Sequence, residues 1–371
     1  MDAATRLIRR NDMVACKLAF IDCKMPGSTL KENYSLIGAG VTQSIDQVVN
    51  ITEPHGFSLG AAAMPPGTIN NLHVHYTAEV FMVYSGTWIF RWGVDGKDGE
   101  ITGGPGDVVS IPTWIFRGFS NVGNDAGWIF TALGGDDTGG IIWHPSILST
   151  AAEQGLYLTK DNMLVDTDAG QPKPAPDELL PPIDRPTMEG LRRFTVAEMR
   201  RRVVTGAERP WSSAALLDAC IPGHASAIAP VIGHGMTQDL QQQPAITNPH
   251  GFSMEWLRIE PGSTVGPFRL DEQQVLMMFA GRIEVTLEGD KPLPVEIQEV
   301  FSVPAKSWRS ITNVSDVVAE IAVLTAGDQK KHPRWHPDIL AQAAAQGFGV
   351  DHSGYVAPLR LLPPQMSIAA E

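Results

Sequence analysis

Short apolar runs, broken repeatedly by turn residues, dominate the chain. In the first part of the sequence they are separated by stretches such as PPG at 65–67 and NVGND at 121–125. Apolar runs of this length between such turns are typical of β-strands. We therefore predict strands near 36–42, 46–51, 57–64, 70–76, 79–85, 87–92, 107–111, 116–120 and 127–133. With 36 glycines and 28 prolines in the chain, this punctuation predicts an all-β barrel or sandwich.

The pattern occurs twice. Residues 37–58 match residues 232–253 without a gap, at an offset of 232 − 37 = 195. Farther along, the offset becomes 192, because 143–145 match 335–337. A single repeat at so long a period indicates two homologous domains rather than a solenoid.

The repeat sets the expected domain boundaries. We predict an N-terminal barrel at 1–165, a proline-rich linker at 166–187 and a C-terminal barrel at 188–371. A short helix is expected from Pro145 to near Gly155, and a second from Pro337 to Gly347, because proline favours the first turn of a helix.

The net charge limits the partners that we expect, and the cysteine content indicates the redox compartment. The net charge of −13 argues against nucleic acid and anionic membrane surfaces. The three cysteines, Cys16, Cys23 and Cys220, have no CxxC spacing, which favours a reducing compartment over a disulfide framework. Residues 1–20 lack the apolar core of a secretory signal, and no apolar run is long enough to indicate a membrane span. We expect a cytoplasmic protein whose partner is a small molecule.

The candidate chemistry lies in the stretch from Gly67 to Gly86. His73 and His75 are two residues apart, so on a strand both point to the same face. Glu79 follows at an even spacing and can meet both imidazoles if the chain continues or turns back as a hairpin. Two imidazoles and a carboxylate form a metal site most at home with Fe(II), although Mn, Zn, Ni or Cu also fit. The alternative is a pair of surface histidines on an edge strand.

These residues resemble the cupin superfamily. Its first motif is met in full by Gly67, His73, His75, Glu79 and Gly86. Its second motif is met by Gly106, Pro112 and Asn121, but its metal-binding histidine is replaced by Arg117. The resemblance implies a bicupin: two tandem double-stranded β-helix, or jelly-roll, barrels with the site in the barrel mouth.

The replaced histidine leaves a set of three ligands. The resemblance implies that most metal-binding members of the family use three histidines and one glutamate as ligands. The guanidinium of Arg117 has no lone pair with which to bind a metal. Arg117 has a counterpart in Arg309, so two interpretations stay open. It anchors an anionic group of the substrate, or it forms an ion pair that both barrels need.

The second copy serves as an internal control. At the offset of 195, the three ligand positions become Phe268, Leu270 and Gln274, so the C-terminal barrel is expected to lack metal ligands. Residues found in both copies are expected to serve the shared fold. By this test the pairs His55/His250 and His144/His336 are predicted to be structural.

Three functional hypotheses follow. In the first, the chain is a dioxygenase that uses Fe(II) on His73, His75 and Glu79 to cleave a small aromatic or carboxylate-bearing substrate, with Arg117 orienting an anionic group. In the second, a divalent metal acts only as a Lewis acid in an isomerase, lyase or hydrolase. In the third, the chain is a small-molecule-binding cupin with a vestigial site. A monomer and a homodimer are both compatible with two fused barrels.

Overall fold

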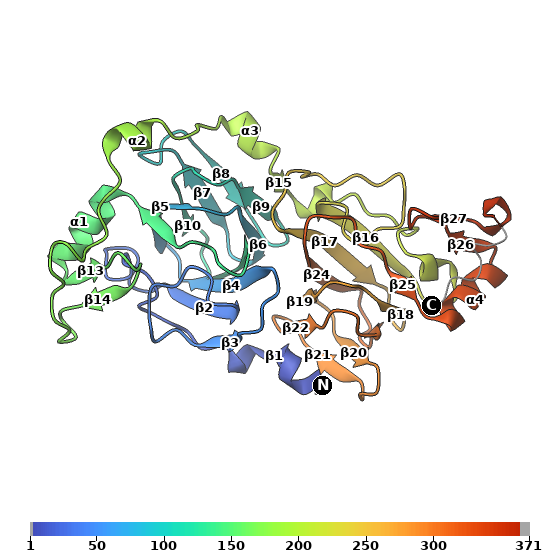
Figure 1. Cartoon of the computed structure of the whole chain (residues 1–371). Coiled ribbons are helices and arrows are strands. Elements are labelled where there is room, and N and C mark those ends of the chain that lie inside the picture. Colours follow the sequence, from blue (N-terminus) through green and yellow to red (C-terminus); the bar gives the residue numbers. More distant parts are fainter. Residues whose placement is uncertain (1–2, 364–371) are drawn as a thin grey trace. The chain divides into compact units, whose positions relative to one another are not determined.

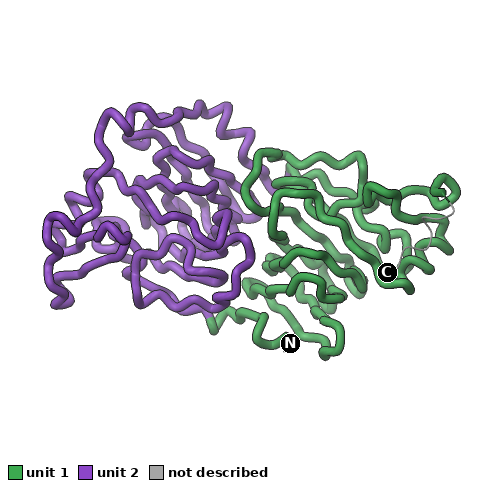
Figure 2. Tube along the Cα trace, in the orientation of Figure 1, with its two compact units in different colours: residues 1–12, 208–371 green, residues 13–207 purple. Residues whose placement is uncertain are grey.

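The computed structural model describes residues 3–363 and divides into two compact units (Figures 1 and 2). One unit comprises residues 13–207, and the other comprises residues 1–12 with 208–371. The division differs from the expected boundaries at both ends. The short strand β1 (Leu7–Ile8) pairs with β22 (Val300–Val303) of the second barrel, and β15 (Val203–Val204) pairs with β9 (Val108–Ile111) of the first. Each segment thus joins the barrel whose strand edge its backbone completes.

The first barrel, residues 13–207, is built from two mainly antiparallel sheets. The larger sheet has the order β15-β9-β6-β11-β4-β2-β3, with β6 (Glu79–Ser85), β11 (Gly127–Gly134), β4 (Phe57–Met64), β2 (Glu32–Ile37) and β3 (Val49–Ile51). The smaller has the order β12-β5-β10-β7-β8, with β12 (Ile141–Trp143), β5 (Ile69–His75), β10 (Arg117–Asn121), β7 (Trp88–Trp92) and β8 (Gly99–Gly103).

The second barrel repeats this plan. Its larger sheet has the order β1-β22-β19-β24-β17-β16, with β19 (Gln274–Ala280), β24 (Ala319–Ala326), β17 (Phe252–Ile259) and β16 (Ser226–Ile232). Its smaller sheet has the order β21-β20-β23-β18-β25, with β21 (Leu293–Val295), β20 (Ile283–Leu287), β23 (Arg309–Asn313), β18 (Thr264–Arg269) and β25 (Arg334–Trp335). The predicted all-β class with two tandem barrels is confirmed.

Residues shared by the two copies make equivalent hydrogen bonds inside each barrel. Gln43 Oε1 accepts hydrogen bonds from the Ile21 amide and from Trp143 Nε1, and Gln238 Oε1 does the same for Leu217 and Trp335. These buried amides replace water for backbone and indole donors that would otherwise be left unpaired. The repeat therefore conserves interactions as well as strand order.

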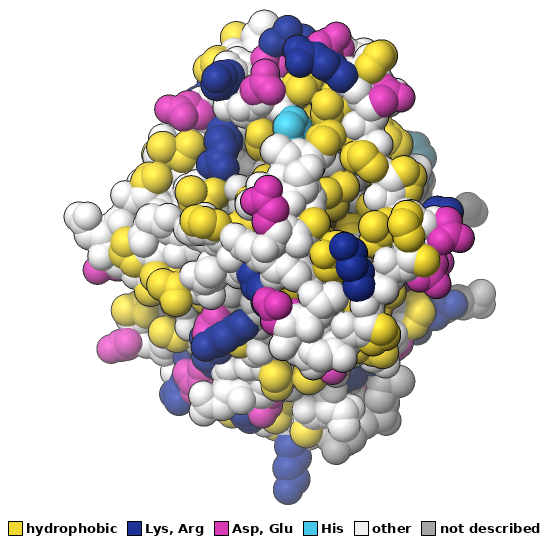
Figure 3. Space-filling model, turned by 90° about the vertical axis from the view of Figure 1, so that its left-hand side faces the viewer, with side chains coloured by type: hydrophobic (Ala, Val, Ile, Leu, Met, Phe, Trp, Pro, Cys, Tyr) yellow, Lys and Arg dark blue, Asp and Glu magenta, His cyan; other side chains and the backbone are white. Residues whose placement is uncertain are grey.

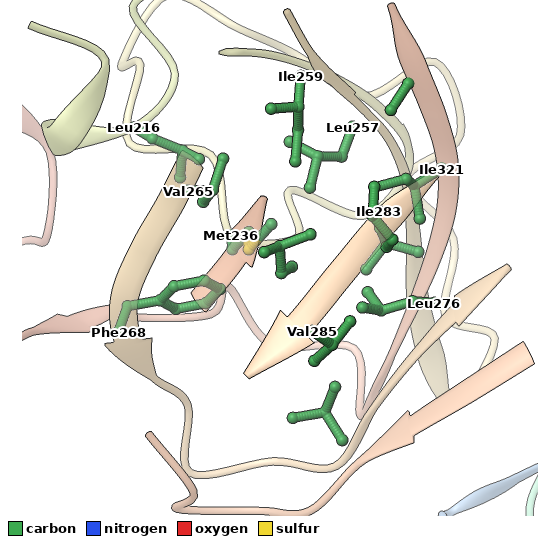
Figure 4. Close-up of a cluster of buried hydrophobic side chains, with 14 of the residues drawn as sticks. Leu216, Met236, Leu257, Ile259, Val265, Phe268, Leu276, Ile283, Val285 and Ile321 are labelled. Atoms are coloured by element: carbon green, nitrogen blue, oxygen red, sulfur yellow. The ribbon is translucent and has the colours of Figure 1, made fainter. Parts of the chain in front are cut away.

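Apolar side chains from both sheets fill each barrel. In the second barrel the cluster runs from Leu216 and Met236 to Phe268 and Ile321, and these side chains point toward one another across the sheets (Figure 4). In the first barrel, aromatic residues carry much of the packing, among them Trp88, Phe90, Trp92 and Phe119. Their burial removes apolar area from water, which is the main term that stabilises such a core.

Most predicted elements of the first copy appear with small shifts of their ends. The largest shift is that of β2, expected at 36–42 and found at Glu32–Ile37, and β12 and β8 were not predicted. β8 overlaps the ends of the two segments at 93–100 and 103–107, where the sequence indicated turns. Its alternation of Ile101 and Gly103 with polar residues is too short to stand out. Both helices predicted after prolines are present, as α1 (Pro145–Glu153) and α4 (Pro337–Ala345).

The proline-rich segment runs along the first unit rather than standing apart from it. The Lys160 amide donates to the Glu178 carbonyl and the Leu180 amide to the Leu158 carbonyl, each at 2.9 Å. The remaining elements of the described chain are short: β13 (Leu156–Leu158), β14 (Leu164–Asp166), α2 (Arg185–Glu189), α3 (Val196–Arg200), β26 (Phe348–Val350), β27 (Val356–Pro358) and the 3-10 turns at Ala3–Arg6, Arg10–Asp12, Gly206–Glu208, Leu217–Cys220 and Leu359–Leu361.

The surface shows mixed charge. On the face drawn in Figure 3, basic and acidic side chains are interspersed among uncharged and apolar ones. Within residues 3–363, no helix has the length and apolar content that crossing a membrane requires.

Candidate metal centre

The turn between β5 and β6 brings the three candidate ligands together. His73 and His75 lie on one face of β5, and Glu79 is the first residue of β6 in the other sheet. His73 Nε2 is 3.1 Å from His75 Nε2, and His75 Nε2 is 3.6 Å from Glu79 Oε1. One donor atom from each side chain lies within 4.8 Å of the others. The alternative of two surface histidines is excluded, because His73 and His75 are only 2% and 1% exposed.

The protonation states suit metal binding. Burial lowers the pKa of His73 well below its usual value, and neighbouring His75 and Arg117 lower it further. Burial and Arg117 lower the pKa of His75 as well. Burial alone would raise the pKa of Glu79, but His75 and Arg117 outweigh it and bring the value to about 2. At neutral pH the site therefore offers two neutral imidazoles and one carboxylate, the forms in which these side chains bind metals.

A backbone contact fixes the tautomer of His73. Its Nδ1 lies 2.7 Å from the Asn71 carbonyl oxygen. A carbonyl only accepts, so Nδ1 carries the proton and Nε2 presents its lone pair toward His75. Histidine ligands commonly donate their other ring N–H in this way, which orients the ring and raises its basicity. The donor set fits a divalent transition metal.

Arg117 donates a hydrogen bond to the carboxylate of Glu79. Its Nε donates to Glu79 Oε2 at 3.2 Å and its Nη1 to the Ile115 carbonyl at 3.3 Å. Burial lowers the pKa of Arg117 to about 10, against the opposing effect of Glu79, so the side chain stays charged at neutral pH. On β10, Arg117 is the register partner of His73. The position of the missing third histidine is thus filled by a cation that pairs with the ligand carboxylate.

A small cavity of about 70 Å³ borders the ligands. His73, His75 and Glu79 form part of its wall, whereas Arg117 does not. The other lining side chains are aromatic, aliphatic or uncharged polar groups, including Phe20, Tyr34, Phe119, Trp143, Leu133, Ser58, Asn70 and Thr131. The Trp143 ring lies 5.3 Å from that of His73. This space suits a small molecule bound beside the metal ligands.

The second barrel has the same strand pairing around the positions that correspond to His73, His75 and Glu79, but other residues occupy them. Phe268 pairs in register with Arg309 and Trp335, just as His73 pairs with Arg117 and Trp143. Arg309 Nη2 donates to Gln274 Oε1 at 3.2 Å. Both barrels thus pair an arginine with the residue at the glutamate position. This shared contact favours a structural role for Arg117 in holding residue 79.

The paired histidines lie outside the site. His144 and His336 are the N-caps of α1 and α4, where each side chain accepts a backbone hydrogen bond. His55 and His250 each contact the carbonyl two residues earlier, at 2.7 Å. Such contacts serve helix ends and turns.

Two residues that sequence reasoning missed lie beside the ligands. Asn70 lines the cavity, and Lys31 Nζ lies 2.7 Å from Asn70 Oδ1. The comparison of the two copies contained a signal for the first, because Asn70 corresponds to Val265 at the offset of 195.

Comparisons with known proteins find a cupin domain in the first barrel and solved structures with the same fold. The cupin domain matches residues 61–131, and no curated protein sequence matches the chain significantly. Among solved structures, the formate complex of oxalate decarboxylase from Lactobacillus farciminis has a TM-score of 0.55 at 11% identity, covering 90% of this chain and 89% of that one. Oxalate decarboxylase from Bacillus subtilis at pH 4.6 gives 0.53 at 12% identity, with coverages of 91% and 82%. Vicilin from hazelnut, Corylus avellana, gives 0.51 at 10% identity, with coverages of 89% and 88%.

The family match and the fold agree. Residues 61–131 match the cupin domain, and the chain has a bicupin fold, with two cupin-like barrels in one polypeptide. At these identities the structural likeness establishes the fold alone. Oxalate decarboxylases and a vicilin both share it, so function must be argued from the site.

Proposed function

We propose that the first barrel is a metal-dependent enzyme in which His73, His75 and Glu79 hold Fe(II) for the oxygenative cleavage of a small aromatic or carboxylate-bearing substrate. The observation that carries this is the geometry of the donor set. Three buried donor atoms within 4.8 Å of one another face a cavity, while Arg117 occupies the place of a fourth protein ligand. Coordination positions are thereby left for substrate and O2.

The chain's own residues prepare the site in three ways. The Asn71 carbonyl fixes the tautomer of His73, and Arg117 holds Glu79 ionised and oriented. Arg117 is thus a positioning residue, because the cavity wall lies in front of it. The aromatic walls exclude water and offer flat apolar surfaces to a ring. A bound Fe(II) would supply a Lewis acid and a redox centre.

A non-oxidative reaction at the same ligands is the second candidate. The observation that favours it is the cavity wall, whose hydroxyl and amide groups suit a compact polar substrate as well as a ring. In that case the metal would act only as a Lewis acid in an isomerase, lyase or hydrolase. Consumption of O2 during turnover separates the two. A binding protein with a vestigial site is the remaining alternative, and it predicts no stoichiometric metal.

The proposed setting is a reducing cytoplasm with a small molecule as partner. Cys16, Cys23 and Cys220 are free thiols in the structure, which supports this compartment. Neither nucleic acid nor a membrane is part of the proposal, and it holds for a monomer or a homodimer.

Substitution of the ligands tests the proposal. His73→Ala and Glu79→Ala are each expected to lose bound metal and to lower turnover by roughly a hundred-fold or more, because each removes a direct ligand. His144→Ala, which removes only a helix cap, is expected to keep both. Elemental analysis and O2 uptake with phenolic and aliphatic acids are the measurements. A metal-depleted wild type that retains full turnover would refute the proposal.

A further inference from the structure

A buried cation lies behind the candidate metal centre. Lys31 and Asp22 are both fully buried, and Lys31 Nζ lies 2.5 Å from Asp22 Oδ1. The same ammonium group lies 2.7 Å from Asn70 Oδ1. Taking an ion pair out of water is costly, and it is no better for stability than well-packed apolar residues. We therefore look for a function of the Lys31–Asp22 pair other than stabilising the fold.

Lys31 fixes the orientation of the Asn70 amide. An ammonium group has three donors and no acceptor, so the Asn70 atom facing it must be the carbonyl oxygen. This settles which way the amide points, an assignment that is ambiguous for most asparagines. The Nδ2 group of Asn70 is consequently turned away from Lys31.

The nearest polar neighbour of that Nδ2 group leaves it unpaired. Asn70 Nδ2 lies 3.4 Å from His73 Nδ1. His73 Nδ1 already carries a proton and donates to the Asn71 carbonyl, so it cannot accept another hydrogen bond. Within residues 3–363, Asn70 Nδ2 has no other hydrogen-bond partner. Asn70 Nδ2 is therefore a buried donor on the cavity wall, without an acceptor from the protein.

A β-bulge places this donor beside the ligands. Asn70 and His73 are three residues apart and would face opposite sides of a regular strand. The pairing of β5 with β10 shifts register between Arg117 and Phe119, and this bulge brings the side chains of Asn70 and His73 to the same cavity wall. Gly118 permits the close approach, because a Cβ there would lie 2.7 Å from the Asn70 carbonyl oxygen.

We propose that Asn70, oriented by Lys31, recognises an oxygen atom of the substrate, and that the substrate class is small carboxylates and carbonyl compounds. This inference rests on the proposed function, because it places the substrate in the cavity beside His73. The donor demands an acceptor, and no lining residue is a lysine or arginine that could take over this role. An amide N–H satisfies a carboxylate or carbonyl oxygen without adding charge to the cavity.

The second barrel agrees with this assignment. It keeps the bulge, with a register shift between Val265 and Phe268, and it keeps the buried carboxylate as Asp218, which accepts from the Gly266 amide. Where the first barrel has Asn70, it has the apolar Val265. The amide is thus found in the barrel that has the metal ligands and is replaced in the barrel that lacks them.

Titration of the holoprotein with acetate tests the inference. Asn70→Asp keeps the size of the side chain and the contact with Lys31 but removes the donor. We expect its acetate dissociation constant to rise roughly ten-fold or more, as for loss of a hydrogen bond to a charged group. Asn70→Val, which copies the second barrel, removes the donor without adding a charge that repels acetate, and it should show the loss as well. Asn124→Asp, the same change at an exposed position, should bind as wild type does.

The outcomes separate the two proposals. Equal acetate affinity in wild type and Asn70→Val would overturn the inference, and so would a wild type without saturable acetate binding. Elemental analysis of the same samples reports on the metal centre by itself. A wild type without metal would refute the proposed function, while the titration would still decide the role of Asn70, which lines the cavity in either case.

Discussion

Arg117 lies opposite His73 on the neighbouring strand. It occupies the position at which the cupin motif has a third metal-binding histidine. Its charge lies against Glu79, and the same pairing recurs between Arg309 and Gln274 in a barrel without ligands. A guanidinium that orients one ligand while replacing another should weaken metal binding and keep coordination positions open. We therefore expect the metal affinity of this site to depend partly on Arg117, a residue that does not touch the metal.

Arg117→His tests this role. The imidazole would add a fourth ligand and remove a nearby positive charge, so the affinity for Zn(II) or Mn(II) should rise roughly ten-fold or more. Turnover should fall, because one open position is lost. Competition with a chelator measures the affinity. Arg309→His is the matched control and should bind no additional metal, and an unchanged or weaker affinity in Arg117→His would contradict the account.

Glu255 shows a residue-scale effect in the second barrel. It stands where the first barrel has Gly60, at the offset of 195, and is fully buried. Burial raises the pKa of Glu255 to about 8, against the lowering effects of the Met236 amide and of Lys331 and Lys330. The folded state therefore holds a proton that the unfolded chain releases near pH 4.3.

The sign of the resulting pH dependence follows from proton counting. Between about pH 4.3 and pH 8 the folded state binds more protons at this residue than the unfolded state, so its contribution to stability falls as the pH rises. Glu255→Gln should remove that loss. It should be more stable than wild type at pH 8.5 by about 1–3 kcal/mol, with the difference shrinking toward pH 5. Urea unfolding at both pH values measures this, and a difference that grows on acidification would contradict it.

At the scale of elements, the sequence predicted strands and helices well where the pattern was long. The β5–β6 stretch was predicted because His73, His75 and Glu79 follow even spacing between apolar residues. β8 was missed because its five residues contain two glycines and follow a turn-rich segment. Strand pattern is informative when several consecutive residues alternate, and this strand is too short.

The bulge explains why only part of the site was visible in the sequence. Strand alternation assigns residues to faces, and a bulge breaks that rule at one position. Asn70 therefore fell outside the expected set, although it lies on the same cavity wall as His73. Lys31 was out of reach for another reason, because it meets Asn70 across 39 residues of chain. Contacts of that separation depend on how the barrel closes, which local pattern does not encode.

At the scale of the whole molecule, the internal repeat was the strongest guide. It predicted two barrels and the absence of ligands at Phe268, Leu270 and Gln274. The segments outside the repeat were harder to assign. Residues 1–12 have no counterpart in the repeated pattern, yet β1 completes an edge of the second barrel, with Arg6 Nη2 donating to Ser302 Oγ at 3.0 Å.

Ile8→Asp tests that assignment. Ile8 is 2% exposed and pairs with Val300, so an unpaired charge there should destabilise its unit by about 3 kcal/mol or more. Hydrogen exchange should speed up in β22, while metal content stays as in wild type. Ile45→Asp, at a position that is 83% exposed, is the control. Unchanged protection of β22 would contradict the placement of β1.

The most direct test of the central claim is elemental analysis of anaerobically purified wild type beside His75→Ala. We expect about one iron per chain in the wild type, since one set of three donors is present in the first barrel, and its loss in the variant. The same stoichiometry of zinc or manganese would favour the non-oxidative reaction. Absence of stoichiometric metal from both proteins would contradict the account.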